Sequence, residues 1–170
     1  MKTTKAKPKR HRMVNSLVAL TMMGVAAWID LKAKVVPDWL SLGGMAIGIL
    51  LSCLCPSVHN AGTWWTGGMW AIASCVIVVF VMCWYTNITE HFLRCDTLGG
   101  GDIKIMGALA TMLNWKVMLA VFLTAPVFGL VHFAWKRLHF EVYSIPYCPS
   151  LLAALTFSIV FCKPMWGLIF

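Results

Sequence analysis

The order of apolar and polar residues predicts a chain built from helices. Long apolar runs, each bounded by charge, proline or glycine, cover residues 13–29, 39–55, 63–86, 115–135 and 147–162. A sixth run, 103–114, is only about a dozen residues long and reaches roughly 18 Å as a helix, against a hydrocarbon core of roughly 30 Å. It cannot span alone. Unless this run is a buried turn, the glycine-rich stretch before it must begin below the membrane surface, beside protein or water. We expect an all-α polytopic membrane protein with about six transmembrane helices, the fourth short and entered through a glycine-rich loop.

Composition supports a bilayer environment. Of 170 residues, 60% are hydrophobic and 12% are charged, a balance too apolar for a water-soluble domain of this size. We expect a basic amino-terminal tail at 1–12 and a single membrane-embedded domain at 13–170, with the lipid bilayer as a partner and no nucleic-acid partner. Residues 1–29 could instead be a signal peptide cleaved after VAA at 25–27. Their apolar run of about 17 residues is longer than the roughly 7 to 15 usual in signals, which favours a retained helix.

The acidic residues are distributed asymmetrically in a six-span arrangement. All six fall in the loops, or at the helix ends, of one membrane face: Asp30, Asp38, Glu90, Asp96, Asp102 and Glu141. That face also carries more lysine and arginine than the opposite short loops, so the positive-inside rule makes it cytoplasmic. The six basic residues of the tail at 1–12 are also expected to stay in the cytoplasm, which conflicts with this orientation. The sequence leaves the orientation of the tail open.

Two of these acids, Asp30 and Asp102, are candidate catalytic residues. An aspartate charged at membrane depth costs about 2.5 kcal/mol or more, so it usually has a purpose or a partner. Two carboxylates within hydrogen-bond reach cannot both ionise cheaply, so such a pair can activate a water against a peptide carbonyl and protonate the departing amine. Neighbouring glycines let an extended peptide approach closely. Alternatively, Asp102 only caps the helix that follows it; the residues alone leave both interpretations open.

The histidines and cysteines indicate no metal or cofactor site. Seven cysteines include no C-x-x-C pair, and five histidines show no H-E-x-x-H and no i, i+4 pair, so a zinc peptidase is not expected. We expect most cysteines to be small buried apolar residues. The glycines of Gly44-x-x-x-Gly48 are better explained by close helix packing than by a site.

Lys104 follows Asp102 by two positions, so on a helix the two side chains point about 200° apart and are poorly placed to pair. The lysine could reach the lipid headgroups. It could instead tune the acids electrostatically or hold the loop.

Three separated elements of the chain resemble one family. GGGDIK at 99–104 is similar to the G-x-G-D-x-K signature of the type IV prepilin peptidases, membrane aspartyl proteases. Asp30 with the downstream VVPDWL resembles the family's other catalytic aspartate and its I-P-N element, and IPYCPSLLAAL at 145–155 resembles the stretch that opens its last helix. The resemblance implies a six-helix endopeptidase of the inner membrane that removes the basic leader from prepilins or pseudopilins. Asp30 and Asp102 would act from the cytoplasmic face without metal or cofactor, supported by Gly99, Gly101, Lys104, Pro37 and Asp38.

The chain departs from the family pattern in two places. Asp38 stands where the family usually has asparagine, which adds a third carboxylate near the site. The cysteine-rich insert of the long-form enzymes, which also methylate the new amino terminus, is missing between the first two helices, where the loop is short. The resemblance therefore predicts cleavage and leaves methylation open.

Three functions remain as hypotheses. The first is the aspartyl endopeptidase, the second is a small transporter or proton relay that uses the same two aspartates, and the third is a non-catalytic assembly subunit. A presenilin-like protease is not indicated, because no tyrosine directly precedes an aspartate. The sequence leaves open which prepilin is cut, which aspartate holds the proton and whether the chain forms a homo-oligomer.

Overall fold

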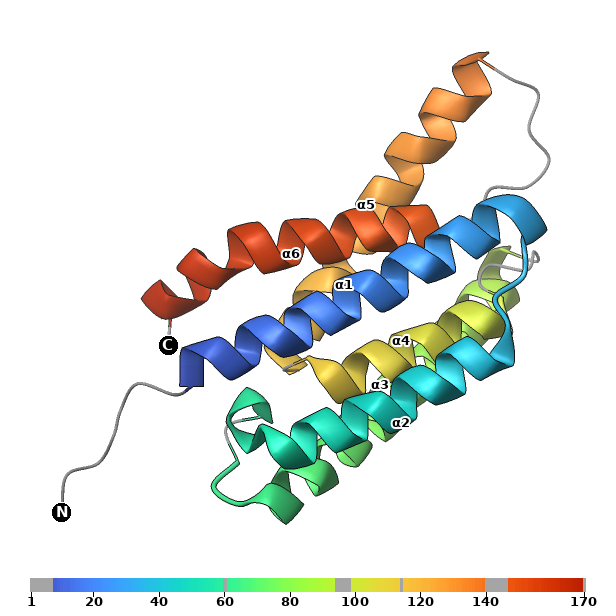
Figure 1. Cartoon of the computed structure of the whole chain (residues 1–170). Helices are drawn as coiled ribbons and strands as arrows, with labels where there is room; N and C mark the ends of the chain where they lie inside the picture. The colour runs from blue at the N-terminus through green and yellow to red at the C-terminus, as the bar shows by residue number, and fades with distance from the viewer. Residues whose placement is uncertain (1–7, 60, 94–98, 114, 140–146, 170) are drawn as a thin grey trace, which may run out of the picture. The chain divides into compact units, whose positions relative to one another are not determined.

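The computed structural model describes residues 8–59, 61–93, 99–113, 115–139 and 147–169, and these residues form helices and no strand (Figure 1). The α-helices are α1 (Pro8–Ala33), α2 (Asp38–Leu54), α3 (Trp64–Leu93), α4 (Gly100–Met112), α5 (Trp115–His139) and α6 (Cys148–Ile169). A short 3-10 helix, η1 (Pro56–His59), follows α2 and has no counterpart among the predicted elements. Each predicted apolar run lies in its own helix, so the all-α fold class is confirmed.

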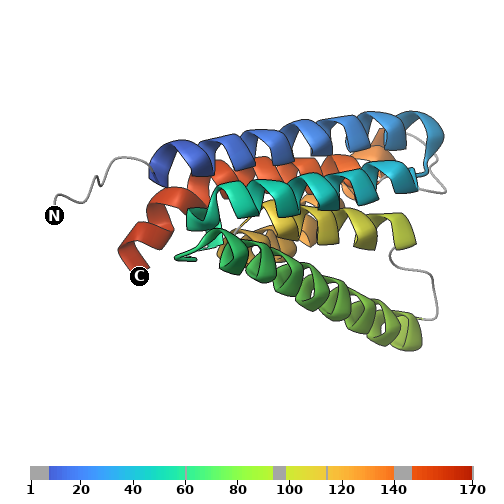
Figure 2. The same ribbon diagram turned by 60° about the horizontal axis from the view of Figure 1, so that its bottom comes forward.

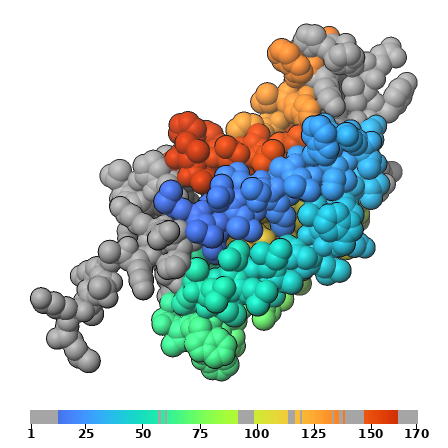
Figure 3. Space-filling model, viewed as in Figure 1, coloured from blue at the N-terminus to red at the C-terminus, as the bar shows by residue number. Residues whose placement is uncertain are grey.

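Two helices contain segments that are long and apolar enough to cross a bilayer, Met13–Ala33 and Trp64–His91. Shorter apolar segments are Asp38–Leu54, Ala120–His132 and Cys148–Phe161. With 13 residues, α4 is about 20 Å long, too short to span alone as the sequence predicts. Many large apolar side chains are exposed, as a surface in contact with lipid requires. Figure 3 shows α2 (cyan to green) at the surface, where Trp39, Leu42, Leu50 and Leu54 are exposed.

Helix α1 extends beyond the predicted apolar run at both ends. It begins at Pro8 within the basic tail and continues through Asp30 to Ala33, because charged residues end a hydrophobic run without ending the backbone helix. The helix ends at Lys34, whose φ of 52° lies in the left-handed region. The Lys34 N–H donates to the carbonyl oxygen of Asp30 at 2.9 Å, the bond that closes an αL helix terminus.

The chain divides into two compact units. The first contains residues up to Ala19 and Pro37–Trp115, and the second contains Leu20–Val36 and Lys116–Phe170. Helix α1 therefore contributes its first part to one unit and its last part to the other.

In the first unit α2 and α4 run in parallel and α3 runs opposite to both (Figures 1 and 2). The direction follows from contacts at both ends. Lys104, near the start of α4, reaches Asp38 at the start of α2, and Ser52, near the end of α2, reaches Thr111 near the end of α4. Residues 105–112 of α4 are all buried, so this short helix is the core of the unit.

Glycines let the helices of this unit approach closely. A Cβ atom at Gly48 would overlap the Thr111 side chain, and one at Gly107 would lie 2.8 Å from Val79 and 3.1 Å from Met45. Gly44 is also buried. The expectation that Gly44-x-x-x-Gly48 serves close helix packing is confirmed at Gly48.

The carboxyl end of α4 is capped by side chains from three neighbouring segments. The last carbonyl oxygens of a helix have no intrahelical donor, and a short helix leaves them inside the protein. The Thr111 carbonyl accepts a hydrogen bond from Ser52 Oγ at 2.7 Å and lies 3.2 Å from His59 Nε2. The Met112 carbonyl accepts one from Asn15 Nδ2 at 3.3 Å. These contacts hold the carboxyl end of α4 against α1, α2 and η1.

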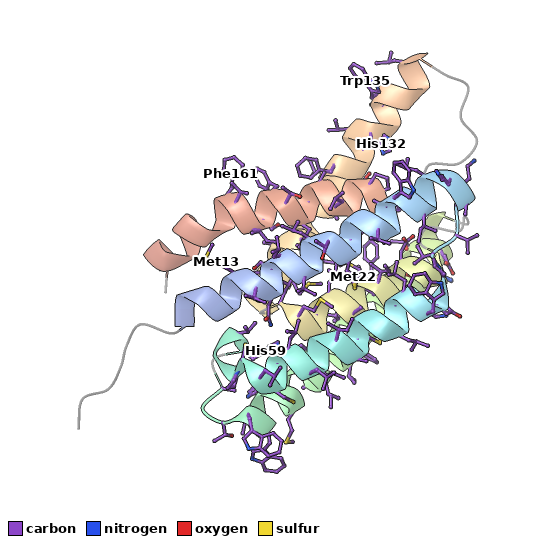
Figure 4. The ribbon with its side chains drawn as sticks, viewed as in Figure 1. Met13, Met22, His59, His132, Trp135 and Phe161 are labelled. Carbon is purple, nitrogen blue, oxygen red and sulfur yellow. The ribbon has the colours of Figure 1, made fainter. Side chains whose placement is uncertain are left out.

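His59 lies on η1 beside this cap (Figure 4). Its Nε2 lies 3.1 Å from Ser52 Oγ, which already donates its proton to Thr111. Because both oxygens facing Nε2 accept, Nε2 must carry the proton in the neutral ring. Burial lowers the pKa of His59, and the hydrogen bond to the Thr111 carbonyl opposes that effect by raising it.

In the second unit α5 packs against α6. The rings of Phe128 and Phe157 have centroids 5.8 Å apart, and Phe157 stacks on Phe161 at 4.8 Å. The Nδ1 atom of His132 in α5 (Figure 4) lies 3.2 Å from the Oγ atom of Ser150 in the first turn of α6. The Phe128–Phe157 and His132–Ser150 contacts hold α6 beside α5.

Candidate active site

Asp30 is a buried acid in the last turn of α1, with 6% of its surface exposed. The backbone N–H of Cys148 donates to its Oδ2 at 3.1 Å. Cys148 is the first residue of α6, where the N–H groups have no intrahelical acceptor and the helix dipole is positive. A carboxylate is well suited to this position. The Cys148 N–H holds the Asp30 side chain, and the Asp30 backbone carbonyl accepts the Lys34 N–H.

The family-like stretch at 145–155 is therefore in direct contact with Asp30. Residues 145 and 146 lie outside the described part of the chain, but Tyr147 is described and its carbonyl accepts the Leu151 N–H at 3.1 Å. This bond begins α6 and presents the Cys148 N–H to the acid. The sequence identified the stretch by resemblance only; the amide donor itself has no sequence signal.

Asp102 is the third residue of α4 and is half-buried. The N-cap is Gly99, with extended backbone at φ −69° and ψ 144° and no side-chain capping bond. The Asp102 N–H donates to the Gly99 carbonyl at 3.0 Å. The interpretation of Asp102 as the N-cap is thus wrong, because the helix begins three residues earlier than that interpretation requires. At the third position its carboxylate still lies near the positive end of the helix dipole.

The glycines before Asp102 are divided between loop and helix. Gly99 is the cap, whereas Gly100 and Gly101 already belong to the first turn of α4. A Cβ at Gly99 would lie 3.5 Å from Asp102 Oδ2, and one at Gly100 would meet nothing within 4 Å. Gly99 and Gly100 are exposed.

Lys104 pairs with Asp38. Its Nζ lies 2.6 Å from Asp38 Oδ1, and the two side chains are 49% and 67% exposed. Pro37 is the N-cap of α2 and places Asp38 in its first turn. Asp38, the third carboxylate expected near the site, is therefore paired with the lysine of the GGGDIK motif. The sequence did not predict this ion pair.

The structure places the candidate residues in two groups. Asp102, Gly99, Gly101, Lys104 and the 37–38 element belong to the first unit, and Asp30 belongs to the second. Within the first group Lys104 and Asp38 are brought into contact. The pairing of Asp30 with Asp102 stays a prediction.

Among the described residues no group of three or more histidine, cysteine, aspartate or glutamate side chains could hold a metal ion. The side chains of five cysteines are described, and none of the five is in a disulfide: Cys55 and Cys148 are buried, Cys53 and Cys75 are intermediate and Cys83 is exposed. Among these five, fewer are buried than we expected. Asp96, Glu141 and Cys95 lie outside the described residues.

Sequence reasoning missed three polar residues that position α4, namely Asn15, Ser52 and His59. Asn15 and Ser52 are almost completely buried within apolar helices, and a polar residue in such a place requires a partner. The presence of these polar residues in apolar helices was therefore the sequence signal that could have identified them. The identity of the partner, a carbonyl oxygen of α4, depends on how the helices pack.

Comparison with known proteins agrees with the sequence resemblance. Residues 17–134 match the type IV leader peptidase family. The chain is 32% identical over 85 residues to a prepilin leader peptidase/N-methyltransferase of Vibrio cholerae serotype O1, covering 48% of this chain and 32% of that protein. It is 29% identical over 129 residues to a protein of the same name from Pectobacterium carotovorum subsp. carotovorum, covering 74% of this chain and 43% of that protein. No solved structure matches.

The chain thus aligns with less than half the length of these two curated relatives. The family match covers more than half of this chain and includes both Asp30 and Asp102. This chain belongs to the type IV leader peptidase family.

Proposed function

We propose that this chain is a membrane aspartyl endopeptidase that removes the basic leader from type IV prepilins or pseudopilins. Membership of the family and the names of the two relatives support this activity. The observation that carries the proposal is the buried Asp30 carboxylate, held by the first amide of α6. An acid buried in a membrane helix is costly, and here the fold provides a dedicated donor that fixes its direction.

The proposed reaction uses Asp30 and Asp102 as one acid–base pair. The ionised carboxylate takes a proton from water as the water oxygen attacks the scissile carbonyl carbon, and the protonated carboxyl hydrogen-bonds to the carbonyl oxygen. A proton from the pair then passes to the peptide nitrogen, the C–N bond breaks, and a carboxylic acid and an amine leave. Neither aspartate is assigned the shared proton.

The open surface at Gly99 and Gly100 suits an extended substrate. Neither glycine presents a side chain, both are exposed, and a Cβ at Gly100 would meet no atom of the described residues within 4 Å. A peptide backbone could lie against this turn close to Asp102. We propose that residues 13–170 act as one peptidase domain in the inner membrane, with the active site facing the cytoplasm.

Co-expression with a type IV prepilin tests this function. We expect wild type to convert the prepilin to the shorter mature form, and Asp30→Asn and Asp102→Asn to leave it unprocessed. Asparagine keeps an oxygen that can accept the Cys148 N–H, so Asp30→Asn removes the acid–base group while preserving the contact with α6. Glu90→Gln, near the carboxyl end of α3, is the matched control and should process the prepilin normally. Processing by either aspartate variant would reject the proposed pair.

A further inference from the structure

We propose that Asp38 is a positioning residue of the peptidase, which acts through its ion pair with Lys104 to hold the first turn of α4. This inference rests on the proposed function, because that turn carries Asp102. It gives Asp38 a role separate from that of the two catalytic acids.

The pair joins the starts of two parallel helices. Asp38 is the first residue of α2, and Lys104 is in the second turn of α4, 66 positions further along the chain. Their 2.6 Å contact is a charge-assisted hydrogen bond, which is shorter and stronger than a neutral one. Asp38 is favoured at this place in its own right, because an acid stabilises the positive end of α2.

The start of α4 needs such a contact because glycines precede it. Glycine loses more conformational freedom on ordering than any other residue, and Gly99 and Gly100 are exposed. Packing becomes complete only at Ile105, which is fully buried. Lys104, directly before that anchor and two residues after Asp102, ties the start of α4 to α2.

The same geometry separates Asp38 from the acid–base chemistry. Oδ1 of Asp38 is bonded to an ammonium group, whereas a general base must present its oxygen to the reacting water. Lys104 is in turn directed to Asp38. An exposed ion pair contributes modestly, so its loss should slow cleavage several-fold, in contrast to the complete loss expected for the catalytic acids.

A double-mutant cycle tests the proposal with Asp38→Ala, Lys104→Met and the double variant. Purified proteins in detergent are assayed on a prepilin, with kcat, KM and the midpoint of thermal unfolding measured for each. We expect each single variant to lower kcat about two- to fivefold, with KM and the unfolding midpoint nearly unchanged, and the double variant to be no slower than either single one. Asp38→Glu, which keeps the carboxylate, should restore most of the rate, and Glu90→Gln should match wild type.

Two kinetic results would overturn the inference. Losses that multiply in the double variant would show that the two residues act independently. Complete loss in Asp38→Ala, comparable to Asp102→Asn, would make Asp38 part of the chemistry.

Hydrogen exchange of the same proteins provides a readout that does not depend on catalysis. We expect faster amide exchange at residues 101–104 in both single variants, with no further increase in the double variant. Unchanged exchange would reject the positioning role. If wild type fails to cleave while exchange responds as expected, the proposed function fails and the ion pair is shown only to order the turn.

Discussion

The backbone amide of Cys148 donates a hydrogen bond to the Asp30 carboxylate across 118 positions of the sequence. It connects the end of α1 with the start of α6 and gives a buried acid a fixed direction. The contact also separates two roles of Asp30, since accepting this bond requires only an oxygen, whereas acid–base catalysis requires a carboxyl group.

Substitutions of Asp30 should separate these two roles. We expect Asp30→Ala to lower the free energy of unfolding by about 1–3 kcal/mol, because it leaves the buried Cys148 amide without this acceptor. Asp30→Asn should lose much less, since its side-chain oxygen still accepts. Thermal unfolding in detergent measures both. Equal stability of the two variants would show that the bond contributes nothing to folding.

Close packing of α2 on α4 can be tested with two glycines of the same helix. A Cβ at Gly48 would overlap Thr111, whereas one at Gly43 would meet nothing within 4 Å. Gly48→Ala should therefore cost about 1–3 kcal/mol of unfolding free energy through overpacking, and Gly43→Ala should be neutral or slightly stabilising. Midpoints of thermal unfolding provide the comparison. A tolerated Gly48→Ala would contradict the packing described for this unit.

Ser52 should stabilise the short helix α4 through its bond to the Thr111 carbonyl at 2.7 Å. Ser52→Ala removes one of the two donors that face this oxygen, so we expect a loss of about 1 kcal/mol. Chemical unfolding in detergent measures the change. Half-buried Thr66 provides a control, because Thr66→Ala removes a hydroxyl that bonds locally to Thr63 and should change the midpoint much less.

His59 should make stability depend on pH. Burial lowers the pKa of its imidazole in the folded protein, so the unfolded chain takes up the proton first as the pH falls. The stability contributed by His59 is therefore complete above its unfolded pKa of about 6.5 and is lost as the pH falls through that value toward the lower folded-state pKa. We expect the unfolding midpoint to drop less between pH 7.5 and pH 5.5 in His59→Gln than in wild type. Identical slopes would exclude this role.

Much of the fold could be predicted because the bilayer imposes simple length rules. Apolar runs identified the six helices, and the length of one run identified α4 as too short to span. The ends were less accurate: α1 continues through Asp30 to Ala33, and α4 starts at Gly100, because backbone helices extend through polar residues and through glycine when tertiary contacts support them.

The contacts within the site could not be predicted. The Lys104–Asp38 pair and the cap formed by Ser52 and His59 depend on the parallel register of α2 and α4. That register is set by side-chain packing at Gly48 and Gly107 rather than by any local pattern. The partner of Asp30 is a backbone amide, and every residue other than proline has one. Sequence could therefore select the acid but not its donor.

The most direct test of the account is whether the side chains at positions 30 and 102 meet. In a variant whose native cysteines are replaced by serine or alanine, Asp30→Cys and Asp102→Cys are introduced singly and together, and membranes are treated with a short bifunctional thiol reagent. The account predicts a cross-link between the two cysteines within one chain, detected by mass spectrometry only in the double variant. Two cysteines that each react with a monofunctional reagent but are never cross-linked would contradict it.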